Sequence, residues 1–496
     1  MALEISPTNF SHCFAFDDVL LKPGYSELVP SEVKVDSRLG LIPLKVPVLS
    51  AAMDTVTEAQ MAIAMALLGG VGVLHKNNSI EEQASDVSRV KKFQHAVITD
   101  PITVKADFTL AQVKELIRET GITGFPVIDN SGKLVGMCTG RDIRYAEDSQ
   151  IRVQDVMSSP VKSLPEGSDH KQAVEFFRKY KVEKLPLVNK EGHLKGLITS
   201  KDWRQQSDHP LALKDDSGSL IVAAALGVGN KDGIDRAMAL VKAKVDCLVL
   251  DSAHGHSKGI IETLKDLRKK FPDVTLIGGN VATVEGAQAL IDAGANVVKI
   301  GVGPGSICTT RIVSGAGVPQ LTAIYEICQN LRAKHPNVSF IADGGIRYSG
   351  DITKALAAGA HAVMLGSLLA GTEESPGETI IYMGRSYKFY RGMGSLSAMK
   401  KGSKDRYRQA SVESSKLVPE GVEARVPYRG KVQDVIYQLV GGLRSGMGYV
   451  GAKDLEDLVK KAQFVRISQG ALKESHVHDV SIVAESPNYS GRPKEE

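Results

Sequence analysis

The chain lacks several features that would define its class at once. Its 496 residues include five cysteines without paired spacing, which fits a reducing compartment better than a disulfide framework. Its longest apolar runs, such as 220–228, are too short to cross a bilayer, and its start lacks the basic and apolar regions of a signal peptide. The formal charge is only +4, which gives no reason to expect nucleic acid or an acidic membrane surface. We therefore expect a cytoplasmic protein with neither membrane nor nucleic-acid partners.

What the chain does contain is a regular series of buried strands. Short, nearly continuous runs of Val, Ile, Leu and Ala recur, and such runs are typical of parallel strands buried on both faces. There are eight, at 46–51, 70–74, 220–226, 247–251, 275–279, 297–301, 339–343 and 362–366. Amphipathic stretches lie between several of them, at 258–270, 284–293 and 324–334. Eight strand–helix units predict an α/β fold of the (β/α)8 TIM barrel type.

An open, doubly wound sheet is the alternative arrangement of such units. Its dinucleotide-binding loop reads G-x-G-x-x-G and opens a helix after a strand. That pattern is absent here, and the stretch 227–233 (GVGNKDG) has the wrong spacing. The barrel is therefore favoured, and a nicotinamide dinucleotide would have to bind to it without a Rossmann loop.

The gap between the second and third strand runs contains an internal repeat. Residues 121–142 (GITGFPVIDNSGKLVGMCTGRD) and 181–202 (KVEKLPLVNKEGHLKGLITSKD) match at an offset of 60. The matched pairs are Pro126 and Pro186, Gly132 and Gly192, Gly136 and Gly196, Thr139 and Thr199, and Asp142 and Asp202. Such repetition predicts two copies of one supersecondary unit. The pattern resembles a tandem cystathionine-β-synthase (CBS) pair, or Bateman module, although a purely structural repeat has the same signature.

This arrangement predicts a barrel interrupted by an inserted domain. Residues 1–93 form the first part of the barrel, an α+β tandem-CBS domain occupies 94–206 with repeats at about 94–148 and 152–206, and 207–496 complete the barrel. Within the last segment, the polar stretch 388–427 is rich in Gly, Ser, Lys and Arg and predicts a mobile flap. The alternative is a surface loop without a role. The tail after about 475 is polar and is expected to pack poorly.

The most informative stretch is 301–311, which reads GVGPGSICTTR and follows an apolar run. It holds a single thiol, Cys308, on a glycine-rich loop beside two hydroxyls and an arginine. Such a thiol is intrinsically very nucleophilic and reacts when exposed, and the end of a barrel strand lies on the catalytic face. Cys308 is therefore a candidate nucleophile. The other cysteines lack this context and are interpreted as packing residues: Cys13, Cys138, Cys247 and Cys328.

Two late glycine loops predict a phosphate site. Residues 341–347 (IADGGIR) and 364–368 (MLGSL) end the seventh and eighth strand runs, where barrels often bind phosphate through backbone N–H groups. The residues suited to that role are Gly344, Gly345, Gly366 and Ser367. Asp343 is an anion and suits a ribose diol instead, and Ser306 and Tyr390 add hydroxyl donors. Flavin-dependent barrels carry similar loops, so the pattern indicates a phosphorylated ligand without identifying it.

Together these motifs resemble the inosine-5′-monophosphate (IMP) dehydrogenase family over nearly the whole chain. The resemblance covers the strand at 47–56 (PVLSAAMDTV), the inserted pair, the loop around Cys308, both glycine loops, the flap and the tail. It implies oxidation of IMP to xanthosine 5′-monophosphate (XMP) with NAD, in guanine nucleotide synthesis. Cys308 would add to C2 of the purine, and water would hydrolyse the covalent thioimidate left after hydride transfer.

The resemblance also assigns roles that the residues alone do not. Arg406 and Tyr407 match a mobile dyad that acts as the base in hydrolysis, and Thr310 matches a proton relay. Without the resemblance Arg406 would be an ordinary surface cation, since the free pKa of arginine exceeds about 12. The implied contacts to IMP are Ser50, Ser306, Asp343, Gly344, Gly345, Gly366, Ser367, Tyr390, Arg391, Gly392, Met393, Gly394 and Glu420. The implied contacts to NAD are Asp251, Ser252, Gly301, Val302 and Gly303.

A potassium ion and nucleotide effectors are implied in the same way. The potassium ligands would be backbone carbonyls of Gly303, Gly305 and Cys308, joined by Glu474, Ser475 and His476 from a neighbouring subunit. The resemblance therefore implies a homotetramer or an octamer. ATP or GTP is expected at the inserted pair, on Arg141, Asp142, Lys201 and Asp202. A metal site on His254 and His256 is not expected, because no acidic or thiol partner has suitable spacing.

Two other functions are alternatives at this point. A GMP reductase, which deaminates GMP to IMP with NADPH, has a similar barrel and cysteine, but the inserted pair and the Arg406–Tyr407 dyad argue against it. A purine-nucleotide sensor with an inactive barrel would need a lost catalytic residue. Cys308, Thr310 and Arg406 are all present.

Overall fold

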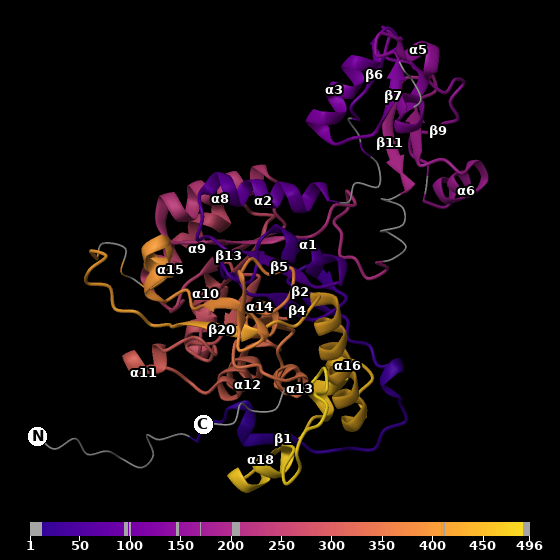
Figure 1. Cartoon of the computed structure of the whole chain (residues 1–496). Coiled ribbons are helices and arrows are strands. Elements are labelled where there is room, and N and C mark those ends of the chain that lie inside the picture. The colour runs from indigo at the N-terminus through magenta and orange to yellow at the C-terminus, as the bar shows by residue number, and fades with distance from the viewer. Residues whose placement is uncertain are drawn as a thin grey trace, which may run out of the picture. The chain divides into compact units, whose positions relative to one another are not determined.

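The computed structural model describes residues 12–93, 98, 101–144, 148–168, 170–200, 209–407, 409 and 412–489. The chain divides into two compact units (Figure 1). The larger unit consists of the residues up to 93, of 211–215 and of those from 220 onward, and the smaller of 94–210 with 216–219. Each unit has its own hydrophobic core.

Eight parallel strands close into a barrel in the larger unit. They are β4 (Val48–Ser50), β5 (Val71–Leu74), β12 (Ala223–Leu226), β13 (Cys247–Asp251), β14 (Thr275–Val281), β15 (Val297–Ile300), β16 (Ser339–Asp343) and β17 (Ala362–Leu365). They follow chain order around the barrel, and β5 closes the ring by pairing with β12. The predicted TIM barrel is therefore confirmed, with one strand in each of the eight apolar runs.

Helices follow the strands in the chain and pack against them. The longer ones are α1 (Ala59–Leu67), α2 (Ile80–Lys92), α8 (Arg236–Lys242), α9 (Lys258–Lys270), α10 (Val284–Asp292), α12 (Gln320–Leu331) and α13 (Ser349–Ala357). Two short helices, α11 (Thr310–Ser314) and α14 (Ser367–Ala370), begin in the loops after β15 and β17. The helix predicted at 324–334 starts earlier, at Gln320, because Pro319 precedes it with a φ fixed near helical values.

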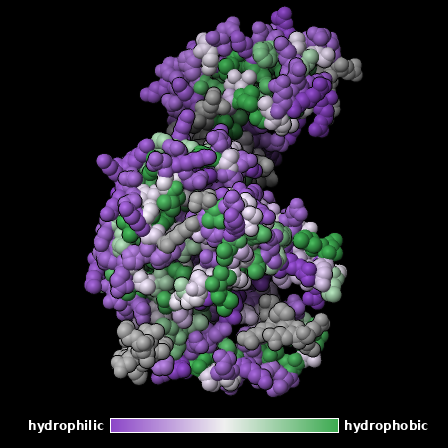
Figure 2. Space-filling view, turned by 90° about the vertical axis from the view of Figure 1, so that its left-hand side faces the viewer, coloured by the Kyte–Doolittle hydropathy of each residue, from purple (hydrophilic) through white to green (hydrophobic). Residues whose placement is uncertain are grey.

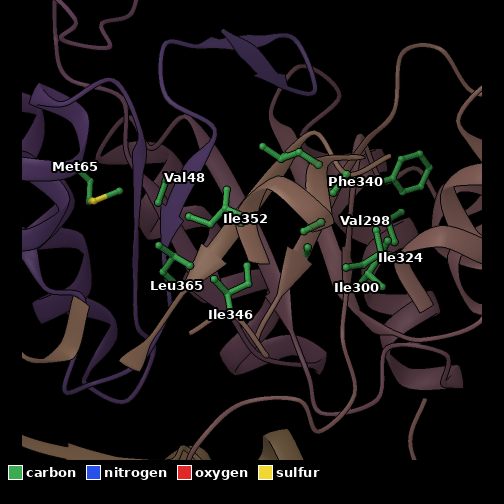
Figure 3. Close-up of a cluster of buried hydrophobic side chains, with 14 of the residues drawn as sticks. Val48, Met65, Val298, Ile300, Ile324, Phe340, Ile346, Ile352 and Leu365 are labelled. Carbon is green, nitrogen blue, oxygen red and sulfur yellow. The ribbon is translucent and has the colours of Figure 1, made fainter. Parts of the chain in front are cut away.

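The layer between the strands and the helices is the main hydrophobic core. Successive side chains of a strand point to opposite faces, so every second strand residue enters this layer. Figure 3 labels residues of the layer from strands, loops and helices: Val48, Met65, Val298, Ile300, Ile324, Phe340, Ile346, Ile352 and Leu365. The intervening strand residues are left to fill the inside of the barrel.

The inside of the barrel is a second core with a charged end. Val297 of β15 and Val249 of β13 are buried in it. Two residues further along the same strands, at their carboxyl ends, stand Lys299 and Asp251, and Asp343 ends β16. The two-residue period places these side chains on the inner face. The sequence therefore directs three charged groups into one end of the barrel.

The smaller unit contains the same β-α-β-β pattern twice. The first copy has β6 (Val104–Lys105), α3 (Leu110–Thr120), β7 (Gly124–Ile128) and β8 (Leu134–Thr139), and the second has β9 (Leu164–Pro165), α6 (His170–Tyr180), β10 (Lys184–Val188) and β11 (Leu194–Thr199). Each copy forms a three-stranded sheet with one parallel and one antiparallel pairing. All four elements recur at the offset of 60 found in the sequence. Two short helices, α4 (Gly140–Arg144) and α5 (Val153–Val156), follow β8.

The segment predicted as a flap has regular structure at both ends. β18 (Thr379–Tyr382), β19 (Arg385–Arg391) and β20 (Glu423–Pro427) form an antiparallel sheet. Between β19 and β20 lie α15 (Leu396–Lys401) and a 3-10 turn at Ser403–Tyr407. The predicted boundaries, 388 and 427, therefore fall inside strands, and sheet pairing joins the two ends of the segment.

The chain then continues to its end outside the barrel. It forms α16 (Val432–Val450), α17 (Leu455–Lys461), β21 (Phe464–Arg466) and α18 (Gln469–Ser475). β21 pairs with β1 (Val19–Leu21) from the other end of the chain, and β2 (Ser37–Leu39) pairs with β3 (Ile42–Leu44). Over the described residues, no helix has the length and apolar content that crossing a membrane requires. Hydrophilic side chains cover most of the face in Figure 2, with hydrophobic ones scattered among them.

Candidate active site

The loops at the carboxyl ends of the barrel strands surround a cleft of about 410 Å³. Barrel enzymes carry their active sites at this end. Most of the predicted site residues line the cleft: Gly301, Gly303, Gly305, Ser306, Cys308, Thr310, Asp343, Gly344, Gly345, Gly366, Ser367, Tyr390, Gly392, Met393, Arg406, Tyr407 and Glu420. Segments from near the start of the described chain, at Ala15, to the flap, at Glu420, therefore meet at one place.

Cys308 begins a chain of hydrogen bonds at the centre of the cleft. Its Sγ lies 3.1 Å from Thr310 Oγ1, and Thr310 Oγ1 donates to Glu420 Oε2 at 2.7 Å. The carbonyl of Glu420 also accepts from the Cys308 thiol at 3.6 Å. The arrangement provides a continuous path by which the thiol proton can reach a carboxylate.

Arg311 holds the loop that carries Cys308. Its Nε donates to the carbonyl of Val302 at 2.9 Å, and its Nη2 donates to the carbonyl of Val318. Gly303 has a φ of +74°, and a side chain there would lie 2.7 Å from Arg311 Cγ. Only glycine therefore fits both the backbone conformation and the space. Burial lowers the pKa of Arg311 from its ordinary value.

The other cysteines differ sharply from Cys308 in their surroundings. Burial raises the pKa of Cys138 to about 11 and that of Cys328 to about 12, and it also raises the pKa of Cys247. Thiols with such pKa values are almost fully protonated at neutral pH and unreactive. These three are packing residues, as predicted. Cys13 is half-buried, and for this residue the same interpretation stays a prediction.

A buried lysine joins two of the predicted ligand residues. Lys299, 2% exposed, places its Nζ 2.9 Å from Asp251 Oδ1 and 2.6 Å from Asp343 Oδ2. The Asn280 side chain accepts from the same ammonium group and donates to Asp343 Oδ2 at 2.8 Å. Sequence reasoning missed Lys299 and Asn280. The available signal was a lysine inside an otherwise apolar strand run, where a charge needs partners.

Arg406 reaches into the cleft and forms an ion pair with Asp251 Oδ2. The Ala253 N–H donates to the carbonyl of Arg406 at 3.2 Å, so the loop after β13 also holds the backbone at this position. The Nε of Arg406 is buried and, over the part of the chain that the structure describes, has no hydrogen-bond partner. The predicted base, Arg406, and the predicted NAD contact, Asp251, therefore form an ion pair with each other.

Tyr407 packs against the backbone of Gly394. A side chain at Gly394 would lie 2.6 Å from Tyr407 Cζ, so glycine is required for the ring to approach. Burial raises the pKa of Tyr407 from its ordinary value, against a smaller lowering by Arg406. The phenol is consequently neutral at physiological pH, when it can both donate and accept a hydrogen bond.

The two late glycine loops bring bare backbone to the cleft. Gly344 and Gly345 have φ values of +92° and +80°, which residues with side chains rarely adopt. At Gly366, a side chain would lie 3.0 Å from the Tyr390 hydroxyl. Burial raises the pKa of Tyr390, so its hydroxyl remains a neutral donor. Exposed backbone N–H groups of this kind are what a phosphate requires.

Six predicted residues do not line the cleft: Ser50, Asp251, Ser252, Val302, Arg391 and Gly394. Ser50 is fully buried and accepts from Thr57 Oγ1 at 2.8 Å. Arg391 directs its guanidinium to Asp54, with Nε 3.1 Å from Oδ1. The side chains of Ser50, Asp251 and Arg391 are thus occupied by neighbours within the fold.

The potassium prediction concerns backbone carbonyls, and the metal prediction concerns the imidazoles of His254 and His256. The Gly305 carbonyl accepts from the Cys308 N–H at 3.1 Å, and Glu474, Ser475 and His476 lie at the end of α18. The imidazoles of His254 and His256 are 6.4 Å apart between centroids. Within the described ranges, no group of three or more His, Cys, Asp and Glu residues is placed to hold a metal.

The inserted unit has a second cavity, of about 500 Å³. Residues of both repeats line it: Ile98, Pro101, Ile102, Gly121, Ile122, Thr123, Gly124, Glu183, Lys184, Leu197, Thr199 and Ser200. The predicted Asp142 instead accepts from the backbone and hydroxyl of Thr139, and Arg141 is exposed near Glu183. The other two predicted effector contacts, Lys201 and Asp202, lie outside the described residues.

Known proteins resemble the chain along nearly its whole length. Residues 13–478 match the family described as the IMP dehydrogenase / GMP reductase domain. Inosine-5′-monophosphate dehydrogenase of Aquifex aeolicus (strain VF5) is 56% identical over 96% of this chain and 97% of that protein. The protein of the same name from Bacillus subtilis (strain 168) is 53% identical over the same shares of both chains.

A solved structure gives the same result. The crystal structure of a GMP reductase variant from Trypanosoma brucei, in complex with guanosine 5′-monophosphate, matches with a TM-score of 0.85 at 39% identity and covers 96% of this chain and 99% of that chain. The fold of the chain is thus that of a known enzyme class. The chain belongs to the IMP dehydrogenase / GMP reductase family.

Proposed function

We propose that this chain is an IMP dehydrogenase, which oxidises IMP to XMP with NAD and water in guanine nucleotide synthesis. The observation that carries the proposal is that Cys308, Thr310, Glu420 and Arg406 converge on one cleft. A thiol that forms a covalent bond and a separate group that activates water suit an oxidation completed by hydrolysis. Curated relatives that are 52–56% identical carry the IMP dehydrogenase name.

In the proposed first step the Cys308 sulfur bonds to C2 of the purine. NAD, when bound, accepts the hydride that leaves this carbon, and a thioimidate remains on Cys308. The thiol proton leaves through Thr310 Oγ1 towards Glu420 Oε2, along hydrogen bonds of 3.1 and 2.7 Å. Asp343, held by Lys299, accepts from the ribose hydroxyls, and the backbone at Gly344, Gly345 and Gly366 holds the phosphate.

In the proposed second step Arg406 and Tyr407 assist the attack of water on the thioimidate. Both residues line the same cleft as Cys308, and the buried Arg406 Nε has no hydrogen-bond partner among the described residues. The water proton passes to this pair or to Thr310, the C2–O bond forms and the C2–S bond breaks, which returns the thiol. Tyr407 takes part as a neutral phenol, because burial raises its pKa.

The Arg406–Asp251 ion pair supports an order for the two steps. Asp251 is also the proposed contact for the ribose of NAD, and its Oδ2 is taken by Arg406 in this structure. The same oxygen cannot serve both partners in full. We therefore propose that Asp251 would contact the ribose of NAD for hydride transfer and Arg406 for hydrolysis.

A potassium ion fits the donor chemistry of the loop. The carbonyls of Gly303, Gly305 and Cys308 are neutral oxygen ligands, which suit a hard cation of low charge. The ion would hold the loop in one conformation. Further ligands would come from Glu474, Ser475 and His476 of a second copy, in a homotetramer or octamer, and these residues lie at the end of α18.

GMP reductase is the second candidate function, and one argument against it fails. The inserted pair was expected to exclude it, yet the GMP reductase structure covers 96% of this chain, which leaves no room for omitting residues 94–210. The insertion therefore does not separate the two activities. What favours the dehydrogenase is the Arg406–Tyr407 pair in the cleft and the higher identity of the dehydrogenases.

The inserted unit is proposed to be a tandem CBS module that binds a purine nucleotide such as ATP or GTP. Its repeated fold and its cavity between the repeats support this assignment. The cavity residues rather than Arg141 or Asp142 are the better candidates for the contacts. A cytoplasmic location is proposed with the metabolic role.

The proposal is tested by following NADH absorbance with purified protein, IMP and NAD in potassium buffer. NADH production that depends on both substrates is expected. Cys308→Ala should abolish it while calorimetry still detects IMP binding, and the matched control Cys13→Ala should keep normal activity. Consumption of NADPH with GMP, and no NADH formation with IMP, would instead establish the reductase.

A further inference from the structure

We infer that Lys76 is a positioning residue for the reaction, which acts by holding Asp405 and thereby places Arg406 and Tyr407 in the cleft. The inference rests on the proposed function of Arg406. Neither Lys76 nor Asp405 lines the cleft, so neither is a catalytic residue. Asp405 immediately precedes the proposed base, Arg406, and forms an ion pair with Lys76.

The ion pair is buried and has good geometry. Lys76 follows β5 and is 8% exposed. Its Nζ lies 2.7 Å from both carboxylate oxygens of Asp405. Since adjacent Cα atoms are 3.8 Å apart, fixing Asp405 restricts the reach of the next residue, Arg406. Removing one partner would leave the other charge buried and unpaired.

Gly227, at the end of β12, leaves the space that the pair needs. A side chain there would lie 2.6 Å from Asp405 Oδ2 and 3.2 Å from Lys76 Nζ. The carboxylate of Asp405 could not approach this closely if residue 227 were alanine. The glycine is separated in sequence from both members of the pair, so it supports the contact independently.

A second barrel residue contacts the same segment. Asn77 Oδ1 would lie 2.8 Å from a side chain at Gly402, and Asn77 Nδ2 donates to Asp54 Oδ2 at 2.7 Å. Asp251, the last residue of β13, forms an ion pair with Arg406, and Ala253 in the following loop donates to the Arg406 carbonyl. The chain at the ends of β5, β12 and β13 thus contacts residues 402–407 together. Lys76 is the buried cation of this contact surface.

A positioning role predicts an effect on one step of the reaction. Hydride transfer requires the cleft without Arg406 at Asp251, whereas hydrolysis requires Arg406 in place. Loss of the Lys76 charge should therefore leave the first turnover of NADH formation unchanged and slow the steady state by about tenfold or more. The covalent enzyme–purine adduct should accumulate accordingly.

The experiment compares full-length variants by rapid-mixing kinetics and by mass spectrometry of the trapped adduct. Lys76→Met and Asp405→Asn should both show a normal burst, a slow steady state and more adduct. Lys76→Arg should restore most of the rate. The matched control is Lys416→Met, whose ion pair with Glu413 is exposed, at 74% and 71% of the two side chains, and it should behave as the unmodified protein.

Three results would overturn the inference. They are an equal slowing of burst and steady state in Asp405→Asn, no change of either in Lys76→Met, or the same change in Lys416→Met. Asp405 lies outside the barrel strands. Asp405→Asn therefore tests the positioning role even if Lys76→Met does not fold. If the unmodified protein shows no IMP-dependent burst, it is the proposed function that fails, which is a distinguishable outcome.

Discussion

Lys299 links two proposed ligand residues, Asp251 and Asp343, through one buried charge. Its ammonium group contacts carboxylate oxygens of both Asp251 and Asp343. Buried charges are tolerated when they are paired and hydrogen-bonded. With all three groups ionised the cluster has one excess negative charge, and Arg406 compensates for it at Asp251.

Replacing Lys299 tests this link. Lys299→Met leaves two carboxylates buried without their cation, so we expect the free energy of unfolding to fall by about 3–5 kcal/mol. We also expect kcat/KM to fall for both IMP and NAD. Urea unfolding and initial rates measure the two effects. The control is Lys265→Met, at an exposed position on α9, which should change the free energy of unfolding by less than about 0.5 kcal/mol. If Lys299→Met lowered kcat/KM for NAD alone, Lys299 would support only Asp251 and not Asp343.

At the scale of elements, the pairing of β16 with β17 contains a buried histidine. The Phe340 N–H donates to His361 Nδ1 at 3.1 Å, and His361 is 3% exposed. Burial, with the nearby Arg332 and Arg38 guanidinium groups, lowers the pKa of His361 from 6.5 to about 3. The imidazole is therefore neutral in the folded barrel, where it serves as an acceptor.

A pH dependence of stability follows from this pKa. The unfolded chain takes up a proton at His361 near pH 6.5 and the folded chain does so only near pH 3, so the contribution is complete above pH 6.5 and is lost as the pH falls. The expected slope is about 1.4 kcal/mol per pH unit. His361→Gln keeps an acceptor without titrating, and its urea midpoint should fall less between pH 7 and pH 5.5. Parallel curves for the two proteins would contradict the assignment.

At the scale of the whole molecule, the barrel unit is interrupted by about a quarter of the chain. Lys91, near the exit point, donates to Asp215, near the return point, at 2.9 Å and to Asp246 of the barrel at 2.6 Å. This contact lies within the larger unit. The two crossing points are thus held together by the barrel itself, and the insertion is not required to bring them together.

Deleting the inserted unit tests whether it is regulatory. Replacement of residues 94–210 by a short Gly/Ser linker should preserve the barrel and leave kcat within about twofold, since the lining of the cleft belongs to the larger unit. Any effect of ATP or GTP on the rate should disappear. Circular dichroism and initial rates with added nucleotide check both points. Loss of the folded barrel would show that the insertion is structural.

Much of the fold and part of the site follow from local sequence. The apolar runs predict the eight strands because burial on both faces leaves a continuous pattern. The repeat is visible because both copies use the same turn residues, such as Gly132 and Gly192, each with positive φ. Cys308 and the glycine loops stand at the ends of strands, so their place on one face of a barrel follows from topology.

The set of elements, their order and the chemical groups at the strand ends follow from the amino-acid sequence, since these depend on short-range periodicity and turn chemistry. The pairings of charged groups follow only from the folded arrangement: Lys299 with two carboxylates, Arg406 with Asp251 and Lys76 with Asp405, the last across 329 positions. The folded arrangement also decided that Arg391 points to Asp54 rather than to the cleft. Closure of the barrel brings together strand ends that are distant in the sequence. The charged groups that then form pairs depend on side-chain directions, which a local sequence pattern does not specify.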